Sequence, residues 1–296
     1  MTDASSPDDY LLHTQPWQSQ TGDGPLLRGR RRDGAGPLLH FLHGNGLCGG
    51  VYWPMLRRLG EHGLFCHDYE GHGASERPAQ FSGTRALIRR IPQIIDEQIG
   101  AQPLIGIGHS FGGALSLRVA AAHPQRFRAL VLLDPILLPP SAYFGLRLAA
   151  TLRLNPMSRA ARRRRAHWPT REAAYRHLHQ RGIYRGWSDE AFAAFIEYAM
   201  REAADGGCEL SCPGALEGAI FDHPVYPWRA LPKLRCPTLI LYGQDSYGFM
   251  AGAMRRAAHS NPLLQVEALP GGHCFMLEDP ETSAARIRAF LAQHTP

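Results

Sequence analysis

Leu104-Ile105-Gly106-Ile107-Gly108-His109-Ser110-Phe111-Gly112-Gly113 is the most informative stretch of this 296-residue chain. Its apolar run ends at a serine with glycine two residues away on each side, and an apolar helical pattern follows directly, over 114–122. In this strand–turn–helix context, Ser110 must adopt strained backbone angles, and side chains at Gly108 and Gly112 would clash. The turn lifts the serine oxygen clear of the sheet, and the N–H of Phe111 points toward the same space. The stretch therefore predicts a nucleophilic serine at position 110.

Strand and helix patterns alternate on both sides of this stretch. Buried strands are predicted over 37–42, 64–67, 103–107, 129–133, 238–242 and 264–268. Helices are predicted over 52–61, 84–99, 111–122, 252–259 and 281–293. Short apolar runs that alternate with amphipathic helices favour an α/β fold, in which a mostly parallel sheet has helices on both faces.

One central segment, 136–228, breaks this alternation. It contains no convincing strand and reads as a helical cap, so we expect a core made of 37–135 and 229–296. Residues 1–36 are irregular and contain possible first strands, with a hairpin around 26–32. The net charge of +6 lies entirely in the central segment, where 136–206 contain twelve arginines and six acids. The run 162–165 is expected to form a solvated helix face, with attraction to anionic substrates or lipid surfaces as the alternative.

Composition excludes several classes of protein. A hydrophobic content of 44% with mixed charge is typical of a soluble globular chain, and no apolar run approaches the length of a membrane helix. The start of the chain has no signal-peptide pattern, and the six cysteines match no zinc or disulfide spacing. No metal-binding histidine pattern and no nucleic-acid-binding motif is present. We therefore expect a cytoplasmic protein with reduced thiols and without a metal or cofactor.

A nucleophilic serine needs a base and an orienting acid, which in a parallel sheet should follow the carboxyl ends of strands. Asp245 follows the predicted strand 238–242, and His273 follows the predicted strand 264–268. Asp245 can hold the imidazole in the correct tautomer, and His273 can take the serine proton. Asp134, which ends the strand 129–133, is the alternative acid, although a carboxylate before proline also suits a loop-fixing role. We expect Asp245 to be the acid.

The chemistry also needs a second donor for the developing oxyanion, beside the N–H of Phe111. The segment Phe41-Leu42-His43-Gly44-Asn45-Gly46 leaves a strong strand in a glycine-rich turn. Its backbone N–H groups, that of Asn45 above all, can face the same point. Two such donors usually supply the largest single part of acyl-transfer catalysis.

Together these segments resemble the α/β-hydrolase superfamily. The resemblance covers roughly 37–135 and 230–294, through His43-Gly44-Asn45-Gly46, Asp68-Tyr69-Glu70-Gly71-His72-Gly73-Ala74-Ser75, Gly108 to Gly113, Tyr242-Gly243-Gln244-Asp245 and Gly272-His273. It implies a Ser110–Asp245–His273 triad, an oxyanion hole from Asn45 and Phe111, and order Ser, Asp, His along the chain. It does not reach the cap, where substrate choice is usually made.

The expected reaction is hydrolysis of a carboxylic ester through an acyl-enzyme, on a small-molecule substrate with an apolar acyl group. The same triad also serves carbon–carbon bond, lactone and amide hydrolases. His109 weakly disfavours the carbon–carbon hydrolases, which often have asparagine before the nucleophile.

Two alternatives come from other classes of protein. Residues 44–49 form a literal Gly-x-Gly-x-x-Gly, and Asp68 ends the next strand, which together suit an NAD(P)-binding oxidoreductase. The fold is also used by non-catalytic ligand receptors. Every later motif favours a serine hydrolase over both.

Overall fold

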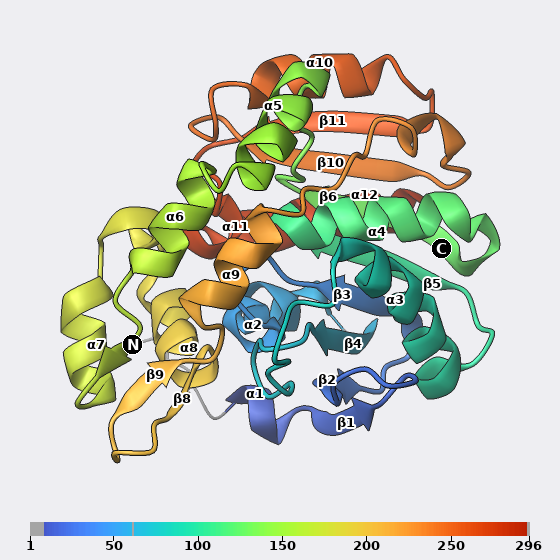
Figure 1. The fold of residues 1–296 in the computed structure, drawn as a ribbon. Helices are drawn as coiled ribbons and strands as arrows, with labels where there is room; N and C mark the ends of the chain where they lie inside the picture. The colour runs from blue at the N-terminus through green and yellow to red at the C-terminus, as the bar shows by residue number, and fades with distance from the viewer. Residues whose placement is uncertain (1–8, 61, 295–296) are drawn as a thin grey trace.

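A central eight-stranded sheet organises the computed structural model, which describes residues 9–60 and 62–294. The strand order is β1-β2-β4-β3-β5-β6-β10-β11 (Figure 1). These strands are β1 (Gln15–Ser19), β2 (Leu27–Arg32), β3 (Gly36–Leu42), β4 (His62–Asp68), β5 (Leu104–His109), β6 (Phe127–Leu133), β10 (Thr238–Gly243) and β11 (Leu264–Leu269). Pairing is parallel from β4 across to β11, whereas β2 pairs antiparallel with both β1 and β4. The predicted α/β class with a mostly parallel sheet is confirmed.

Helices cover both faces of this sheet. One face packs against α3 (Thr84–Ile99), α4 (Ser110–Ala122) and α10 (Met250–Ala258); the other packs against α2 (Trp53–Leu56), α11 (Phe275–Glu278) and α12 (Pro280–His294). Alternate residues of a strand point to opposite faces, so Leu132 faces the α4 layer while Val131 and Leu133 face the α12 layer. Every residue of β5 is buried, as expected for a strand covered on both sides.

The remaining elements are short. They are the helix α1 (Asp9–Leu12) and the 3₁₀ turns η1 (Gly49–Tyr52), η2 (Arg57–Leu59), η3 (Pro124–Arg126), η4 (Gly182–Tyr184) and η5 (Leu231–Lys233). The helix predicted over 52–61 is instead the succession η1, α2 and η2, which ends at Leu59.

The N-terminal segment contributes two strands to the sheet. β1 and β2 form an antiparallel pair, and Arg28 of β2 lies opposite Asp68 of β4. The sheet therefore begins before position 37, where the predicted core began. Of the N-terminal segment, residues 1–8 lie outside the described residues.

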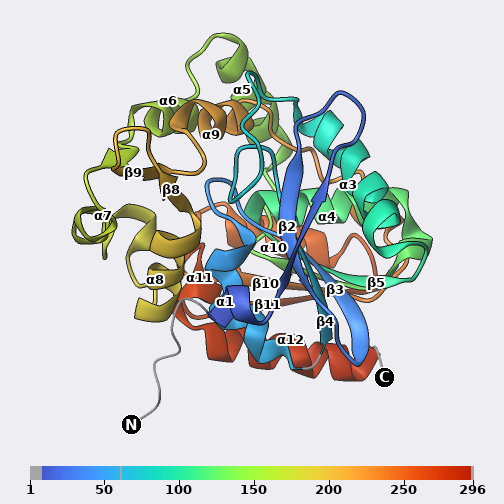
Figure 2. The same cartoon turned by 90° about the horizontal axis from the view of Figure 1, so that it is seen from below.

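The segment between β6 and β10 forms a cap beside the sheet (Figure 2). It contains α5 (Pro140–Thr151), α6 (Pro156–Arg163), β7 (His167–Trp168), α7 (Arg171–Leu178), α8 (Asp189–Tyr198), β8 (Met200–Glu202), β9 (Cys208–Leu210) and α9 (Gly214–Phe221). The expectation that this segment has no strand is wrong, because β7, β9 and β8 form a small antiparallel sheet. These strands have only two or three residues each, too few to show alternation in the sequence.

Candidate active site

Ser110 lies at the sharp turn where β5 ends and α4 begins. Its φ of 53° places a non-glycine residue in the left-handed region, as the motif predicted. A Cβ on Gly108 would lie 2.6 Å from the carbonyl oxygen of Gly112, and one on Gly112 would lie 2.3 Å from that of Leu42. Glycine is therefore required at both positions, because strand and helix backbones meet there.

His273 connects Ser110 with a buried carboxylate. Its Nε2 lies 2.9 Å from Oγ of Ser110, and its Nδ1 lies 2.5 Å from Oδ2 of Asp134. The carboxylate of Asp134 is fully buried, whereas the imidazole is 22% exposed. This arrangement suits proton transfer from the serine to His273, with the carboxylate fixing the tautomer of the ring.

The structure corrects the predicted acid, because Asp134 and not Asp245 contacts His273. The side chain of Asp245 is exposed to solvent, and its backbone N–H donates to Gly271 O at 2.9 Å. Asp134 ends β6, the strand directly beside β5, so its carboxylate and Ser110 leave neighbouring strands at the same edge. The sequence analysis favoured Asp245, which follows β10, whereas the residue in contact with His273 follows β6, the strand between β5 and β10 in the sheet.

The loop after β10 holds the acid in place. Asp134 Oδ1 accepts from the backbone N–H of Gly243 at 2.8 Å, and Oδ2 accepts from Oγ of Ser246 at 2.5 Å. Asp134 itself has a φ of 42°, so its conformation is also strained. With the bond from His273, each carboxylate oxygen has a donor, which is what a buried carboxylate requires.

The turn after β3 presents one unused backbone donor. Gly44 N–H donates to the hydroxyl of Tyr52 at 3.1 Å, and Gly46 N–H donates to Nε2 of His72 at 3.1 Å. Between them, the N–H of Asn45 has no partner within 9–60 and 62–294, and the same is true of Phe111 N–H. Two free donors beside the serine are compatible with an oxyanion hole, which remains a proposal.

A hydrogen-bonded bridge joins this turn to the backbone of His273. Tyr52 accepts from Gly44 N–H and donates to Nδ1 of His109 at 2.6 Å, while Nε2 of His109 donates to the carbonyl of His273 at 3.0 Å. Burial, together with the neighbouring His273, lowers the pKa of His109, so the ring stays neutral and can accept the tyrosine proton. The bridge fixes both flanks of Ser110 with buried side chains.

An ion pair from the cap lies over the turn. Arg164 Nε is 3.0 Å from Oε2 of Glu217, whose backbone carbonyl accepts from Nδ2 of Asn45 at 3.1 Å. Arg162 is exposed but pairs with Asp222, the residue after α9, at 3.4 Å. Arg163 is exposed and has no acidic partner among the described residues. The arginine run is therefore not a uniform solvated face, since Arg162 and Arg164 join α6 to the acids at α9.

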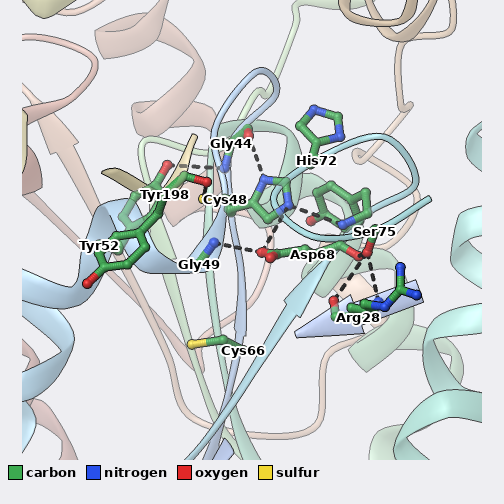
Figure 3. Close-up of polar contacts among 12 residues, drawn as sticks. Arg28, Gly44, Cys48, Gly49, Tyr52, Cys66, Asp68, His72, Ser75 and Tyr198 are labelled. Carbon is green, nitrogen blue, oxygen red and sulfur yellow. Dashed lines mark hydrogen bonds and ion pairs between the residues drawn. The ribbon is translucent and has the colours of Figure 1, made fainter. Parts of the chain in front are cut away.

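In the NAD(P)-binding alternative, Asp68 would bind the ribose, but its side chain contacts the protein's own backbone. Asp68 is buried, and its Oδ1 accepts from the N–H of Gly49 at 2.7 Å, as Figure 3 shows. Ser75 holds the same loop against Arg28 of β2. Burial raises the pKa of Asp68 to about 6. The N–H of Gly49 therefore occupies the oxygen that a ribose hydroxyl would need, and it comes from the same glycine-rich turn that would bind the dinucleotide. No group of three or more metal-ligating side chains occurs in the part of the chain described here.

Known proteins match this chain along most of its length. A pimeloyl-[acyl-carrier protein] methyl ester esterase of Xanthomonas oryzae pv. oryzae is 28% identical over 277 residues, which cover 88% of this chain and 96% of the esterase. A type I acyl-CoA thioesterase of Penicillium roqueforti is 38% identical over 103 residues, 34% of this chain. Those residues span only 22% of the thioesterase, so this second likeness is local.

The fold and the sequence give the same classification. The solved structure of E-2-(acetamidomethylene)succinate hydrolase superposes with a TM-score of 0.75 at 24% identity, covering 95% of this chain and 100% of the other. The model of the α/β-hydrolase family matches residues 41–286. The chain belongs to the α/β-hydrolase family.

Proposed function

We propose that the protein hydrolyses carboxylic esters through an acyl-enzyme formed on Ser110. The observation that carries this proposal is the continuous chain Ser110–His273–Asp134, with contacts of 2.9 and 2.5 Å. Such a chain activates a hydroxyl that is otherwise a weak nucleophile. The esterase from Xanthomonas, similar over 88% of this chain, supports an ester as the scissile group.

The first half-reaction follows from the geometry. His273 Nε2 removes the proton from Ser110 Oγ, which attacks the ester carbonyl, while Asp134 stabilises the imidazolium that forms. The oxyanion of the tetrahedral intermediate accepts from the N–H groups of Asn45 and Phe111. When the carbon–oxygen bond of the ester breaks, His273 gives its proton to the leaving alcohol and the acyl group stays on Ser110.

The second half-reaction uses the same groups. Water loses a proton to His273 and attacks the acyl carbon, and the second tetrahedral intermediate uses the same two backbone donors. Collapse returns the proton to Ser110 Oγ and releases the carboxylic acid. No redox partner or cofactor is needed for this balance.

Nitrophenyl esters of graded acyl length test the proposal. We expect nitrophenolate release by the wild type, a mass increase equal to the acyl group on acid-quenched enzyme, and neither in Ser110→Ala. Two other compounds are tested beside the ester: a lactone with the same number of carbon atoms as the acyl group, and the anilide of that acyl group. Both are expected to react more slowly than the ester. Hydrolysis that is undiminished in Ser110→Ala would contradict the proposal.

A further inference from the structure

The segment formed by α5 and α6, residues 140–163 and here called the α5–α6 segment, exposes an unusual amount of apolar surface. Five large side chains of this segment are exposed: Phe144 at 64%, Leu148 at 63%, Leu152 at 58%, Leu154 at 56% and Met157 at 38%. No residue of α5 is buried. Singly exposed apolar residues are ordinary, but a contiguous group of them marks an interaction surface.

Three of these side chains form one continuous stripe. Phe144, Leu148 and Leu152 follow one another at intervals of four residues, so they stand above each other on the same face of the helix. The half-buried Tyr143 and Leu146 lie toward the opposite face. The helix therefore has apolar side chains on two opposite faces, and the stripe is the more exposed of the two.

Along the chain, the segment that contains the stripe carries charge of a single sign, and the acids Asp222 and Glu217, from later in the chain, pair only with its Arg162 and Arg164 among the described residues. No aspartate or glutamate occurs between Asp134 and Glu172, whereas this interval contains eight arginines. Arg147, Arg159 and Arg163 are exposed, and none of the three has an acidic partner among residues 9–60 and 62–294. Arginines left unpaired beside exposed apolar groups favour an anionic partner with an apolar interior.

A cationic hollow adjoins the stripe. Its volume is about 690 Å³, and three residues of α5 line it: Tyr143, Phe144 and Arg147. Arg85, Arg118 and Arg229 complete its positive lining, and no acidic residue lines it. Such a hollow can receive phosphate groups next to the apolar stripe.

We propose that the α5–α6 segment docks the protein on anionic lipid surfaces, with Phe144, Leu148 and Leu152 inserted at the headgroup boundary and the arginines bound to lipid phosphates. A second copy of the chain would bring the same positive charge against this face, so self-association there is disfavoured. The stripe lies on the outside of a helix, as insertion into a lipid surface requires. No described helix is long and apolar enough to cross a membrane.

The α5–α6 segment is joined to the site by a short stretch of chain. α5 begins six residues after Asp134, and the N–H of Ile136 donates to the carbonyl of Ser110 at 3.3 Å. Docking through this segment would therefore act close, along the chain, to the residues around Ser110.

Vesicle sedimentation tests the docking without any turnover. Wild-type protein is expected to bind vesicles of phosphatidylglycerol and phosphatidylcholine in equal parts, and to bind pure phosphatidylcholine far less. The arginine variant combines Arg147→Gln, Arg159→Gln and Arg163→Gln. It should lower the partition coefficient about a hundredfold, because each arginine near an anionic surface contributes about fivefold. The stripe variant combines Phe144→Ser, Leu148→Ser and Leu152→Ser, and it should lower the partition coefficient at least about tenfold, because apolar insertion is lost.

Matched variants separate docking from general surface change. One control removes apolar side chains that are exposed elsewhere on the protein, by Leu12→Ser, Ile183→Ser and Leu263→Ser. The other control removes arginines that are exposed elsewhere, by Arg89→Gln, Arg235→Gln and Arg255→Gln. Both controls should bind as the wild type does. Each stripe and arginine variant should keep wild-type activity on a short, water-soluble ester, which reports the triad independently.

Two results would overturn the proposal. One is failure of the wild type to bind anionic vesicles. The other is loss of vesicle binding in the arginine variant while the stripe variant binds normally, which would mean that the surface recognises anionic charge alone and inserts nothing into the lipid.

Discussion

The surroundings of Ser110 and the α5–α6 segment are built by opposite rules. Around the serine, buried side chains such as Tyr52, His109 and Asp134 each contact a specific partner, and the backbone is strained at Ser110 and Asp134. In α5 no residue is buried, and the charge has one sign. Specific contacts fix the first region, whereas the second is exposed and available for contact. Changes of one atom should therefore matter near Ser110, whereas in the α5–α6 segment only the summed apolar and charged surface should matter.

The largest expected effect separates the two candidate acids. Asp134→Asn should lower kcat by about 10⁴-fold, because an amide holds His273 in the wrong tautomer. Asp245→Asn, the matched control on the exposed loop, should leave kcat within about twofold, as is usual for a surface position. Steady-state kinetics on a nitrophenyl ester gives both values. A loss in Asp245→Asn equal to that in Asp134→Asn would show that the loop after β10 supplies the acid.

The next effect compares two neighbouring arginines of the cap. Arg164→Gln should lower the free energy of unfolding by about 2–3 kcal/mol, because Glu217 then remains buried without its cation. Arg163→Gln should change it by no more than about 0.5 kcal/mol, because Arg163 is exposed. Urea denaturation of the two variants measures the difference. Equal losses would mean that the pair between α6 and α9 contributes no stability.

A third effect depends on pH. Burial lowers the pKa values of six histidines, to about 3 for His67 and about 4 for His72. The unfolded chain takes up protons near pH 6.5 and the folded chain does not, so stability is full above that pH and falls with acidification toward these values. Asp68 acts oppositely, since its pKa is raised to about 6 and its stabilisation is lost as pH rises through that value. The histidines outnumber it, so stability should fall from pH 6.5 to 5.

One variant isolates a single histidine from this sum. His67→Leu should reduce the loss between pH 7 and 5 by about 2 kcal/mol, because each histidine kept neutral at pH 5 costs about that much. His123→Gln, at an exposed position, should leave the pH dependence unchanged. Urea denaturation at a series of pH values measures both. An unchanged slope in His67→Leu would mean that His67 titrates equally in the folded and unfolded chains.

The smallest effect concerns the bridge from Tyr52 to His273. Tyr52→Phe leaves Gly44 N–H and His109 without their shared partner and should lower kcat about tenfold, with little change in KM, because the reacting groups lose their orientation. Tyr69→Phe is the control, because the buried hydroxyl of Tyr69 has no hydrogen-bond partner among the described residues. A fall in kcat of the same size in both variants would deny the bridge a positioning role.

The sequence predicted the core far better than the cap, and the reasons are physical. The elbow at Ser110 depends on residues that are adjacent in the chain, and glycine at 108 and 112 is forced by backbone contacts. The acid was misplaced because Asp134 and Asp245 both follow strands, and the choice depends on the lateral strand order, which no local pattern carries. The support from Ser246 also depends on that order.

The cap offered weaker signals. β8 and β9 are joined by a turn through Asp205-Gly206-Gly207, in which Gly206 has a φ of 81°. That turn signal was present in the sequence, but strands of three residues have no readable period. The inward pairing of Arg164 was hidden because its acid lies 53 residues further along the chain.

Covalent labelling with a fluorophosphonate tests the central claim most directly. The reagent phosphonylates only a serine whose hydroxyl is activated, so intact-mass spectrometry should show a single adduct, and peptide mapping should place it on Ser110. Ser110→Ala should give no adduct, and Asp134→Asn should react far more slowly than Asp245→Asn. An adduct on another residue, or equal labelling rates in the two aspartate variants, would contradict a Ser110–His273–Asp134 triad.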